Sequence, residues 1–257
     1  MSFYDAVILG ILQGLTEFLP VSSSGHLVLA KTLLKVKESG ISFEVLVHLG
    51  SLLAVLIYFR SKIILLIKSL FVKQMVKERS MVLYLIIATI PAVIAVLLFK
   101  DFFESRFSNP FMTSWMLLAT GAILVSTGFV KVGKKKVSLL TSFIIGVGQA
   151  IAIIPGISRS GTTISTGMFA GVDPSEAAEF SFLMAIPAIL GAGVFKIKAL
   201  LAINASLLPP YLLAFVITFI TSFFAIYAVL SVIRKGKFVY FGYYCFALGA
   251  FGLYLFW

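Results

Sequence analysis

Long runs of apolar residues, separated by short polar segments, recur along the whole chain. Six of these runs are long enough to cross roughly 30 Å of hydrocarbon as helices. They cover residues 43–59, 81–99, 111–130, 179–195, 208–233 and 238–257. The pattern therefore predicts an all-α polytopic membrane protein. Because no stretch between the runs is long enough to fold separately, we expect residues 1–257 to form a single membrane domain.

Two further apolar segments, residues 3–36 and 139–172, are interrupted in the middle by polar clusters. The first cluster reads TEFLPVSSSGH and the second PGISRSGTT. Each half is too short to span a bilayer comfortably, which predicts two re-entrant helix hairpins. Residues 62–78 carry several basic side chains on an apolar background, which predicts a helix lying at the membrane interface.

The two interrupted segments resemble each other. The shared positions lie 136 residues apart and are Gly10 and Gly146, Gln13 and Gln149, Ser22 and Ser158, Ser24 and Ser160, and Gly25 and Gly161. Glu44 and Glu179 extend the match at a spacing of 135. This predicts an internal repeat over about 1–130 and about 137–257. A hairpin returns to its own side and three spans follow it, so the second copy must be inverted, with both tips near the midplane.

Composition fits a membrane protein, since 60% of the 257 residues are hydrophobic and only 12% are charged. The net charge of +11 does not indicate nucleic-acid binding, because the Lys and Arg residues lie between apolar runs. They concentrate in the connections 60–79, 131–136 and 234–237, which the positive-inside rule assigns to the cytoplasm. The connection 100–110 has mixed charge, as an outside loop can have. The N-terminus lacks the features of a cleaved signal, so we expect it to be retained.

Polar side chains in the first cluster supply the parts of a catalytic site. Gln13 and Glu17 are four residues apart and share a helix face. They are followed by a helix-ending proline, three hydroxyls, a glycine that permits a turn, and a histidine, which are Pro20, Ser22, Ser23, Ser24, Gly25 and His26. An ionised side chain such as Glu17 is expensive at membrane depth, so we take it to be functional.

The second cluster has the composition of an anion site. Its Ser- and Gly-rich tip leads into a helix N-terminus, where free N–H groups and the helix dipole attract negative charge. Arg159 adds a planar guanidinium that can bind two oxygens at once. The expected phosphate ligands are Ser22, Ser24, Ser158, Arg159, Ser160, Gly161, Thr162 and Thr163. Because neither tip alone is complete, we expect the two tips to meet.

Simpler interpretations exist for the same residues. Ser and Thr in membrane helices often only bond neighbouring backbone, and Glu17 with Arg159 could form a purely structural ion pair. His48 lies in an apolar run without a polar cluster, so we expect it to satisfy a helix neighbour. Cys245 is the only cysteine and is expected to serve in packing.

The motifs LQGLTEFLPVSSSGH and PGISRSGTT resemble the two signatures of the undecaprenyl-pyrophosphate phosphatase family, also called the bacitracin-resistance family. FEVLVHLGSLLAV and AAEFSFLMAIPAILGAG extend the similarity over most of the chain. The resemblance implies a bacterial inner-membrane enzyme that removes the terminal phosphate of polyprenyl pyrophosphate and so recycles the carrier of cell-wall precursors. It also implies a divalent metal, Mg²⁺ or Ca²⁺, and an active site that faces the outer side. Gln13 departs from many members, which have a second glutamate there.

With this resemblance, Glu17, Ser23, His26 and Arg159 become the expected catalytic residues. Arg159 neutralises phosphoryl charge, while Glu17 with Gln13 holds the metal or Glu17 orients His26. Three nucleophiles remain open: Ser23 activated by His26, which we favour, His26 itself, or a water activated by His26. The expected partners are polyprenyl pyrophosphate, membrane lipids and, as an option, a second copy in a homodimer, with no nucleic acid.

Two alternative functions fit parts of the pattern. A lipid-carrier flippase or transporter could use the same inverted repeat, although transport needs no nucleophile beside an anion clamp. A phosphatidic-acid-type phosphatase would share the Ser-Gly-His of residues 24–26 and the Ser-Arg of residues 158–159. That class needs a second histidine after the Ser-Arg pair, and His26 and His48 are the only histidines in the chain.

Overall fold

The structure is a computed structural model that describes residues 1–36, 40–106 and 109–257. Within these ranges the regular elements are helices, apart from an isolated bridge between Lys135 and Val172, which confirms the all-α class. In chain order they are α1 (Phe3–Phe18), α2 (Ser23–Leu33), α3 (Ile41–Tyr58), α4 (Arg60–Ser69), α5 (Val76–Arg106), α6 (Pro110–Ser126), η1 (Thr127–Phe129), α7 (Leu139–Ile151), α8 (Arg159–Phe169), α9 (Pro174–Phe195), α10 (Ile197–Leu201), α11 (Leu208–Arg234) and α12 (Tyr240–Phe256).

Five helical segments are long and apolar enough to cross a membrane by length and composition. They are α3, the Val76–Phe99 part of α5, α6 with η1, α9 and α11, so the chain is a multi-pass membrane protein. The sixth predicted span corresponds to α12, whose 17 residues lie at the lower end of the lengths that cross a bilayer. Its crossing stays a prediction.

Some predicted boundaries differ from the structure. α9 begins at Pro174 instead of residue 179, because Asp173 caps it by accepting the N–H groups of Ser175 and Glu176. The expected interface helix over 62–78 is two pieces, α4 and the start of α5. The expected outside connection over 100–110 includes residues 107–108, which lie outside the described residues.

The turn between α4 and α5 has a clear cause. Arg79 donates to the carbonyl oxygens of Ser69 and Val72 at 3.1 and 2.9 Å. These bonds satisfy carbonyl oxygens at and just after the end of α4, which favours the end of the helix there.

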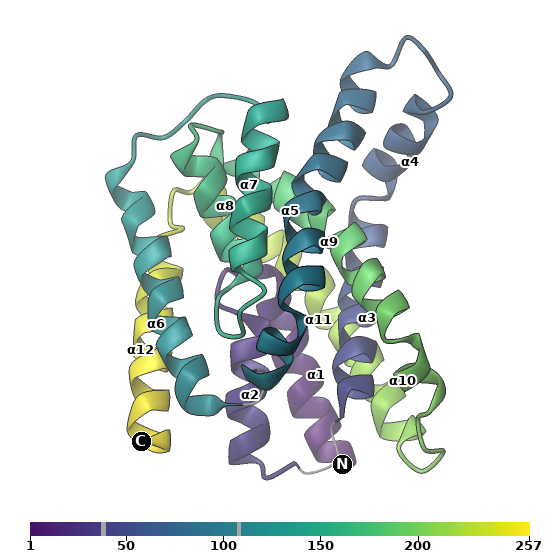
Figure 1. Cartoon of the computed structure of the whole chain (residues 1–257), viewed down its shortest axis with the longest axis vertical. Helices are drawn as coiled ribbons and strands as arrows, with labels where there is room; N and C mark the ends of the chain where they lie inside the picture. The colour runs from purple at the N-terminus through teal and green to yellow at the C-terminus, as the bar shows by residue number, and fades with distance from the viewer. Residues whose placement is uncertain (37–39, 107–108) are drawn as a thin grey trace.

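In Figure 1 the three basic connections lie at the upper end of the bundle and both termini at the lower end. The positive-inside rule requires such loops to share one side of the membrane.

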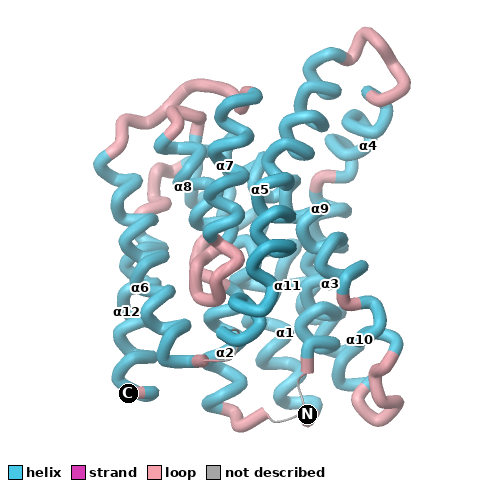
Figure 2. The backbone as a smooth tube through the Cα atoms, viewed as in Figure 1, coloured by secondary structure: helices cyan, strands magenta, loops and turns pink. Residues whose placement is uncertain are grey.

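The interrupted segments form two pairs of short helices, α1 with α2 and α7 with α8. Ser2 and Ser138 begin the first helix of each pair with a capping box. Ser22 and Ser158 cap the second helix, where each hydroxyl accepts the N–H of the residue three positions later. Figure 2 shows that the loop between α7 and α8 lies inside the bundle and not at its end.

Each short pair packs against a long helix from the other half of the chain. α1 lies along α11, and α7 lies along α5. Glycines allow the close approach, since a Cβ at Gly10 would lie 2.9 Å from the Ala214 carbonyl oxygen and one at Gly146 only 2.5 Å from that of Ala88. In addition, α6 packs on α12 and α3 on α9. The two halves are therefore interlocked around the polar clusters.

Gly146→Ala should destabilise the fold, because the new Cβ would meet backbone of α5 that cannot move aside. We expect a loss of about 1–3 kcal/mol, seen as a lower midpoint of thermal unfolding in detergent. Gly191→Ala is the matched control on α9, since nothing lies within 4 Å of a Cβ at that position. Equal midpoints for the two variants would contradict the tight contact of α7 with α5.

Candidate active site

The two polar clusters meet through a buried ion pair. Arg159 Nη2, at the start of α8, donates to Glu17 Oε1, near the end of α1, at 2.6 Å. The side chains are 17% and 5% exposed, so water screens the pair little. A second contact joins the tips, since Ser160 Oγ donates to the Leu19 carbonyl oxygen at 3.1 Å. The prediction that the tips meet is confirmed.

The other carboxylate oxygen of Glu17 gathers three more groups. Ser23 Oγ donates to it at 2.6 Å and Gln13 Nε2 at 2.9 Å, while His48 Nε2 lies 3.5 Å away. Glu17 thus connects side chains from α1, α2, α3 and α8. A hydroxyl that donates to a carboxylate is polarised toward its oxyanion, which is how a serine nucleophile is prepared.

A cavity of about 260 Å³ opens beside Glu17. The predicted site residues on its wall are Glu17, Ser22, Ser23, Ser24, Ser158 and Arg159. Glu44, near the start of α3, and Lys196, just after α9, also line it. The start of α3 and the end of α9 lie toward the end of the bundle that holds the termini (Figure 1). The cavity therefore extends away from the basic connections.

One guanidinium nitrogen of Arg159 is an unpaired hydrogen-bond donor among the described residues. This atom, Nη1, is buried and has no hydrogen-bond partner within the described part of the chain. A buried donor on a charged group is costly to leave unpaired, and this one belongs to a residue on the cavity wall. An anion in the cavity would satisfy it, and phosphate oxygens match the planar fork of arginine well.

The four predicted phosphate ligands that follow Arg159 in α8 lie behind the cavity wall. Ser160, Gly161, Thr162 and Thr163 are buried and are not on the cavity wall. The Thr163 hydroxyl bonds the Arg159 carbonyl oxygen and Ser181 Oγ, both at 2.7 Å. These groups shape the tip and pack α8 on α9. Thr162 keeps a buried hydroxyl with no hydrogen-bond partner within the described residues, and the assignment of these four residues as phosphate ligands stays a prediction.

His26 is not paired with Ser23. Its Nδ1 lies 2.8 Å from the Ser22 carbonyl oxygen, and its Nε2 lies 2.8 Å from the hydroxyl of Tyr244 on α12. Neither nitrogen is left to take a proton from Ser23, and His26 is not on the cavity wall. In this structure Ser23 is hydrogen-bonded to Glu17 and not to His26, and the catalytic roles of Ser23 and His26 stay predictions.

His48 lines the cavity although it was expected only to satisfy a helix neighbour. Its Nδ1 donates to the Glu44 carbonyl oxygen at 2.7 Å, the helix-neighbour contact that was expected. Its Nε2, however, faces Glu17, and the ring lines the cavity. The sequence feature that points to this position is the spacing of Glu44 and His48. They are four residues apart, which places them on one face of a helix.

The second tip is anchored by α6, which carries no predicted site residue. The Thr120 hydroxyl donates to the Gly156 carbonyl oxygen at 2.9 Å and accepts the Ser158 N–H at 3.1 Å. Gly156 has a φ of +94°, and a Cβ there would lie 2.6 Å from the Thr113 carbonyl oxygen, so only glycine fits. Nothing in the sequence separates Thr120 from other hydroxyl residues in apolar runs.

Comparison with known proteins identifies the family. The family profile described as Bacitracin resistance protein BacA matches residues 6–251. The chain belongs to the BacA family. It is 42% identical to Undecaprenyl-diphosphatase 1 of Shouchella clausii, over 96% of this chain and 94% of that protein. The Undecaprenyl-diphosphatase of Carboxydothermus hydrogenoformans is 41% identical (97% and 95%), and that of Syntrophotalea carbinolica 42% (97% of each).

In this BacA-family chain the expected metal ligands are Glu17 and Gln13. Two side chains are too few to hold a metal ion alone, so other ligands would have to complete the site. No group of three or more His, Cys, Asp or Glu side chains that could hold a metal ion occurs among residues 1–36, 40–106 and 109–257. Gln13 turns its amide nitrogen to Glu17, and its buried oxygen has no described partner. Since an amide can be turned over without a change of shape, the two side chains would supply two oxygens to a cation, although Gln13 is buried and is not on the cavity wall.

Proposed function

We propose that this protein is an undecaprenyl-diphosphatase, which hydrolyses polyprenyl pyrophosphate to the monophosphate and inorganic phosphate. One observation carries the proposal: the Ser23 hydroxyl is held on a carboxylate whose other oxygen is bound to an arginine with a spare buried nitrogen. The relatives at 41 and 42% identity carry this activity in their names. None of those names supports the flippase alternative.

Ser23 is the proposed nucleophile. Its Oγ attacks the terminal phosphorus while the bond from that phosphorus to the bridging oxygen of the lipid monophosphate breaks. The hydroxyl proton passes to Glu17, to which it is already hydrogen-bonded. Arg159 neutralises the charge on the phosphoryl oxygens. Water then hydrolyses the phosphoserine, which releases inorganic phosphate and restores the hydroxyl.

A divalent cation, Mg²⁺ or Ca²⁺, belongs to the same proposal. Glu17 and a turned-over Gln13 amide would supply two protein oxygens, and substrate phosphates and water the rest. The orphaned oxygen of Gln13 supports this arrangement. Bound there, the cation would add to the charge neutralisation of the phosphate oxygens.

The proposed architecture is an inverted-topology repeat, about 1–130 and about 137–257, with α1–α2 and α7–α8 as re-entrant hairpins. Helices that correspond in the two halves pack reciprocally: α1 packs on α11, and its counterpart α7 packs on α5. The counterparts α3 and α9 pack on each other, as do α6 and α12. The repeated acidic residues are both paired with lysines, Glu44 with Lys31 and Glu179 with Lys62. A two-fold relation between the halves accounts for this exchange.

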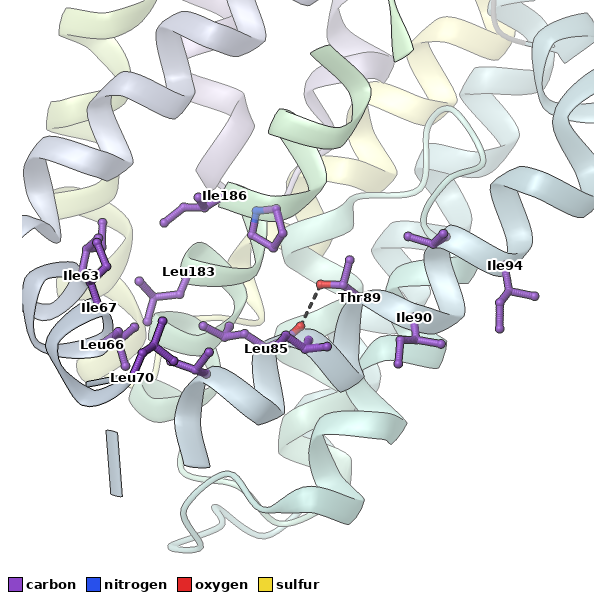
Figure 3. Close-up of a pocket in the computed structure, with 14 residues that line it drawn as sticks. Ile63, Leu66, Ile67, Leu70, Leu85, Thr89, Ile90, Ile94, Leu183 and Ile186 are labelled. Atoms are coloured by element: carbon purple, nitrogen blue, oxygen red, sulfur yellow. Dashed lines mark hydrogen bonds between the residues drawn. The ribbon is translucent and has the colours of Figure 1, made fainter. Parts of the chain in front are cut away.

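The lipid tail is assigned to a larger apolar groove of about 470 Å³ between α4, α5 and α9. Figure 3 shows its aliphatic wall, and the only hydroxyl there, on Thr89, is turned back to the Leu85 carbonyl oxygen. Such a wall suits hydrocarbon alone. Ile186 on this groove and Ile189 on the polar cavity are three residues apart and share a side of α9. The groove and the head-group site therefore lie along the same helix.

The proposed location is the bacterial inner membrane, with the cavity open to the outer side. The basic connections mark the cytoplasmic end of the bundle. The cavity extends toward the opposite end, where Glu44 and Lys196 line it. A pyrophosphate that arrives in the outer leaflet would therefore meet the open side of the site.

Arg159→Lys should lose most activity although the charge is kept, because one ammonium cannot hold Glu17 and a phosphate through two separate nitrogens. We expect kcat/KM to fall by about 100-fold or more, measured as phosphate release from farnesyl pyrophosphate in detergent. Arg234→Lys, at the exposed last residue of α11, is the matched control. Activity of Arg159→Lys within about threefold of wild type would count against the clamp.

Glu17→Gln should abolish turnover while the protein still inserts and elutes as a folded species, because Ser23 loses its proton acceptor. Gln13→Glu, one helical turn away, should be tolerated or should raise the affinity for Mg²⁺ or Ca²⁺, since it adds a carboxylate. Phosphate release and metal titration measure the two effects. Normal kinetics of Glu17→Gln would remove both its proposed roles.

Ile186→Trp should obstruct the tail groove without touching the head-group site. We expect KM for undecaprenyl pyrophosphate to rise about tenfold, while kcat/KM for farnesyl pyrophosphate stays within about twofold. Leu190→Trp is the control, since Leu190 is exposed on the same helix and is not on the groove wall. An equal change for both substrates would place the long tail elsewhere.

A further inference from the structure

Ser22 holds an unusual backbone conformation next to the proposed nucleophile. Its φ of 69° and ψ of 93° lie where residues other than glycine are strained, so surrounding contacts must hold it there. Its carbonyl oxygen accepts both the His26 N–H at 3.1 Å and His26 Nδ1 at 2.8 Å. Because Ser22 directly precedes Ser23, its backbone sets the direction of the Ser23 hydroxyl toward Glu17.

The partners of His26 decide its tautomer. A carbonyl oxygen can only accept, so Nδ1 carries the hydrogen toward Ser22. In the neutral ring Nε2 is then an acceptor, and the Tyr244 hydroxyl donates to it at 2.8 Å. The two rings are also stacked, with centroids 5.6 Å apart and planes 6° apart. Without the hydroxyl, the ring could carry its hydrogen on Nε2, which would turn the Nδ1 lone pair against the Ser22 carbonyl oxygen.

α12 is well placed to hold this tip. Next to Tyr244, the buried Cys245 has its Sγ 3.9 Å from the Pro20 carbonyl oxygen. Gly249 of α12 packs against α6, where a Cβ would lie 2.9 Å from the Ser114 carbonyl oxygen. The helix is therefore locked to α6 and touches the first tip at two points. No residue of α12 lines the polar cavity.

We propose that Tyr244 is a positioning residue for the reaction. It locks His26 as the Nδ1–H tautomer, His26 fixes the Ser22 backbone, and Ser22 holds Ser23 on Glu17. This inference rests on the proposed function of the site. It assigns a role to Tyr244, which lies 218 residues from His26 along the chain, and to a histidine whose two ring nitrogens are bonded away from Ser23.

Tyr244→Phe keeps the stacked ring and removes only the hydroxyl. We expect kcat for farnesyl pyrophosphate to fall about tenfold, while KM stays within about twofold because Arg159 is untouched. Tyr243→Phe is the matched control, since the Tyr243 ring contacts only Tyr240 among the ring pairs of α12. Equal kcat for the two variants would overturn the proposal.

A double-mutant cycle separates positioning from a general structural effect. If Tyr244 acts through His26, Tyr244→Phe should cause little further loss of kcat in a His26→Gln background. The same fold-loss in both backgrounds would show that Tyr244 acts by another route. Thermal midpoints of all variants in detergent, measured alongside, identify any that fail to fold.

The tautomer of His26 gives a readout that needs no turnover. The chain has two histidines, so ¹⁵N spectra of histidine-labelled protein are simple, and His48→Gln assigns them. Wild type should show His26 with the hydrogen on Nδ1, and Tyr244→Phe should shift His26 signals while His48 stays unchanged. An active Tyr244→Phe variant with unshifted His26 signals would overturn the positioning role alone. Absence of phosphate release by wild type would overturn the proposed function and this role together.

Discussion

A carboxylate and a guanidinium can share the interior of a membrane protein only when they are paired, and Glu17 and Arg159 meet this condition across the two halves of the chain. Removing one partner of a buried pair costs about 3–5 kcal/mol, because the other charge is left uncompensated. Each residue belongs to a different pair of short helices, α1 with α2 and α7 with α8. The ion pair therefore forms only when both helix pairs are packed in place, so that completing the fold also assembles the site.

The polar clusters first supply hydrogen-bond partners for backbone groups at the ends of the short helices. A helix that stops inside hydrocarbon exposes N–H and C=O groups that no water can satisfy. Ser22 and Ser158 cap the two inner helices, and Thr120 bonds both sides of the second tip. Glycine contacts along α11 and α5 then hold the hairpins in place. The Ser23 hydroxyl, which caps no helix, and the Glu17–Arg159 ion pair form the candidate active site.

The helical class, the two interruptions and the meeting of their tips can be predicted from the sequence, because they follow from apolar run length and from the cost of Glu17 and Arg159 at membrane depth. The pairing of individual side chains around the tips cannot be predicted in this way. The direction of each group around a tip depends on single backbone angles, such as the φ of 69° at Ser22. His26 is close to Ser23 in sequence, yet the structure pairs it with Tyr244 from the far end of the chain. A helix N-terminus likewise predicts an anion site without showing that, in the first turn of α8, Arg159 lines the cavity while Ser160, Gly161 and Thr162 do not.

Selectivity for a lipid pyrophosphate must come mostly from the head group. A prenyl tail in the bilayer already lies in hydrocarbon, so moving it into the groove between α4, α5 and α9 gains little from the hydrophobic effect and contributes packing and orientation instead. The head group, in contrast, leaves water for a cavity walled partly by Ile153, Ile157 and Ile189, which costs free energy unless its charge is met. In the proposed function Arg159 meets this charge through Nη1, which is buried and has no hydrogen-bond partner within the described residues. The proposed head-group site therefore lies beside the Ser23 hydroxyl, which is where the reaction is proposed to occur.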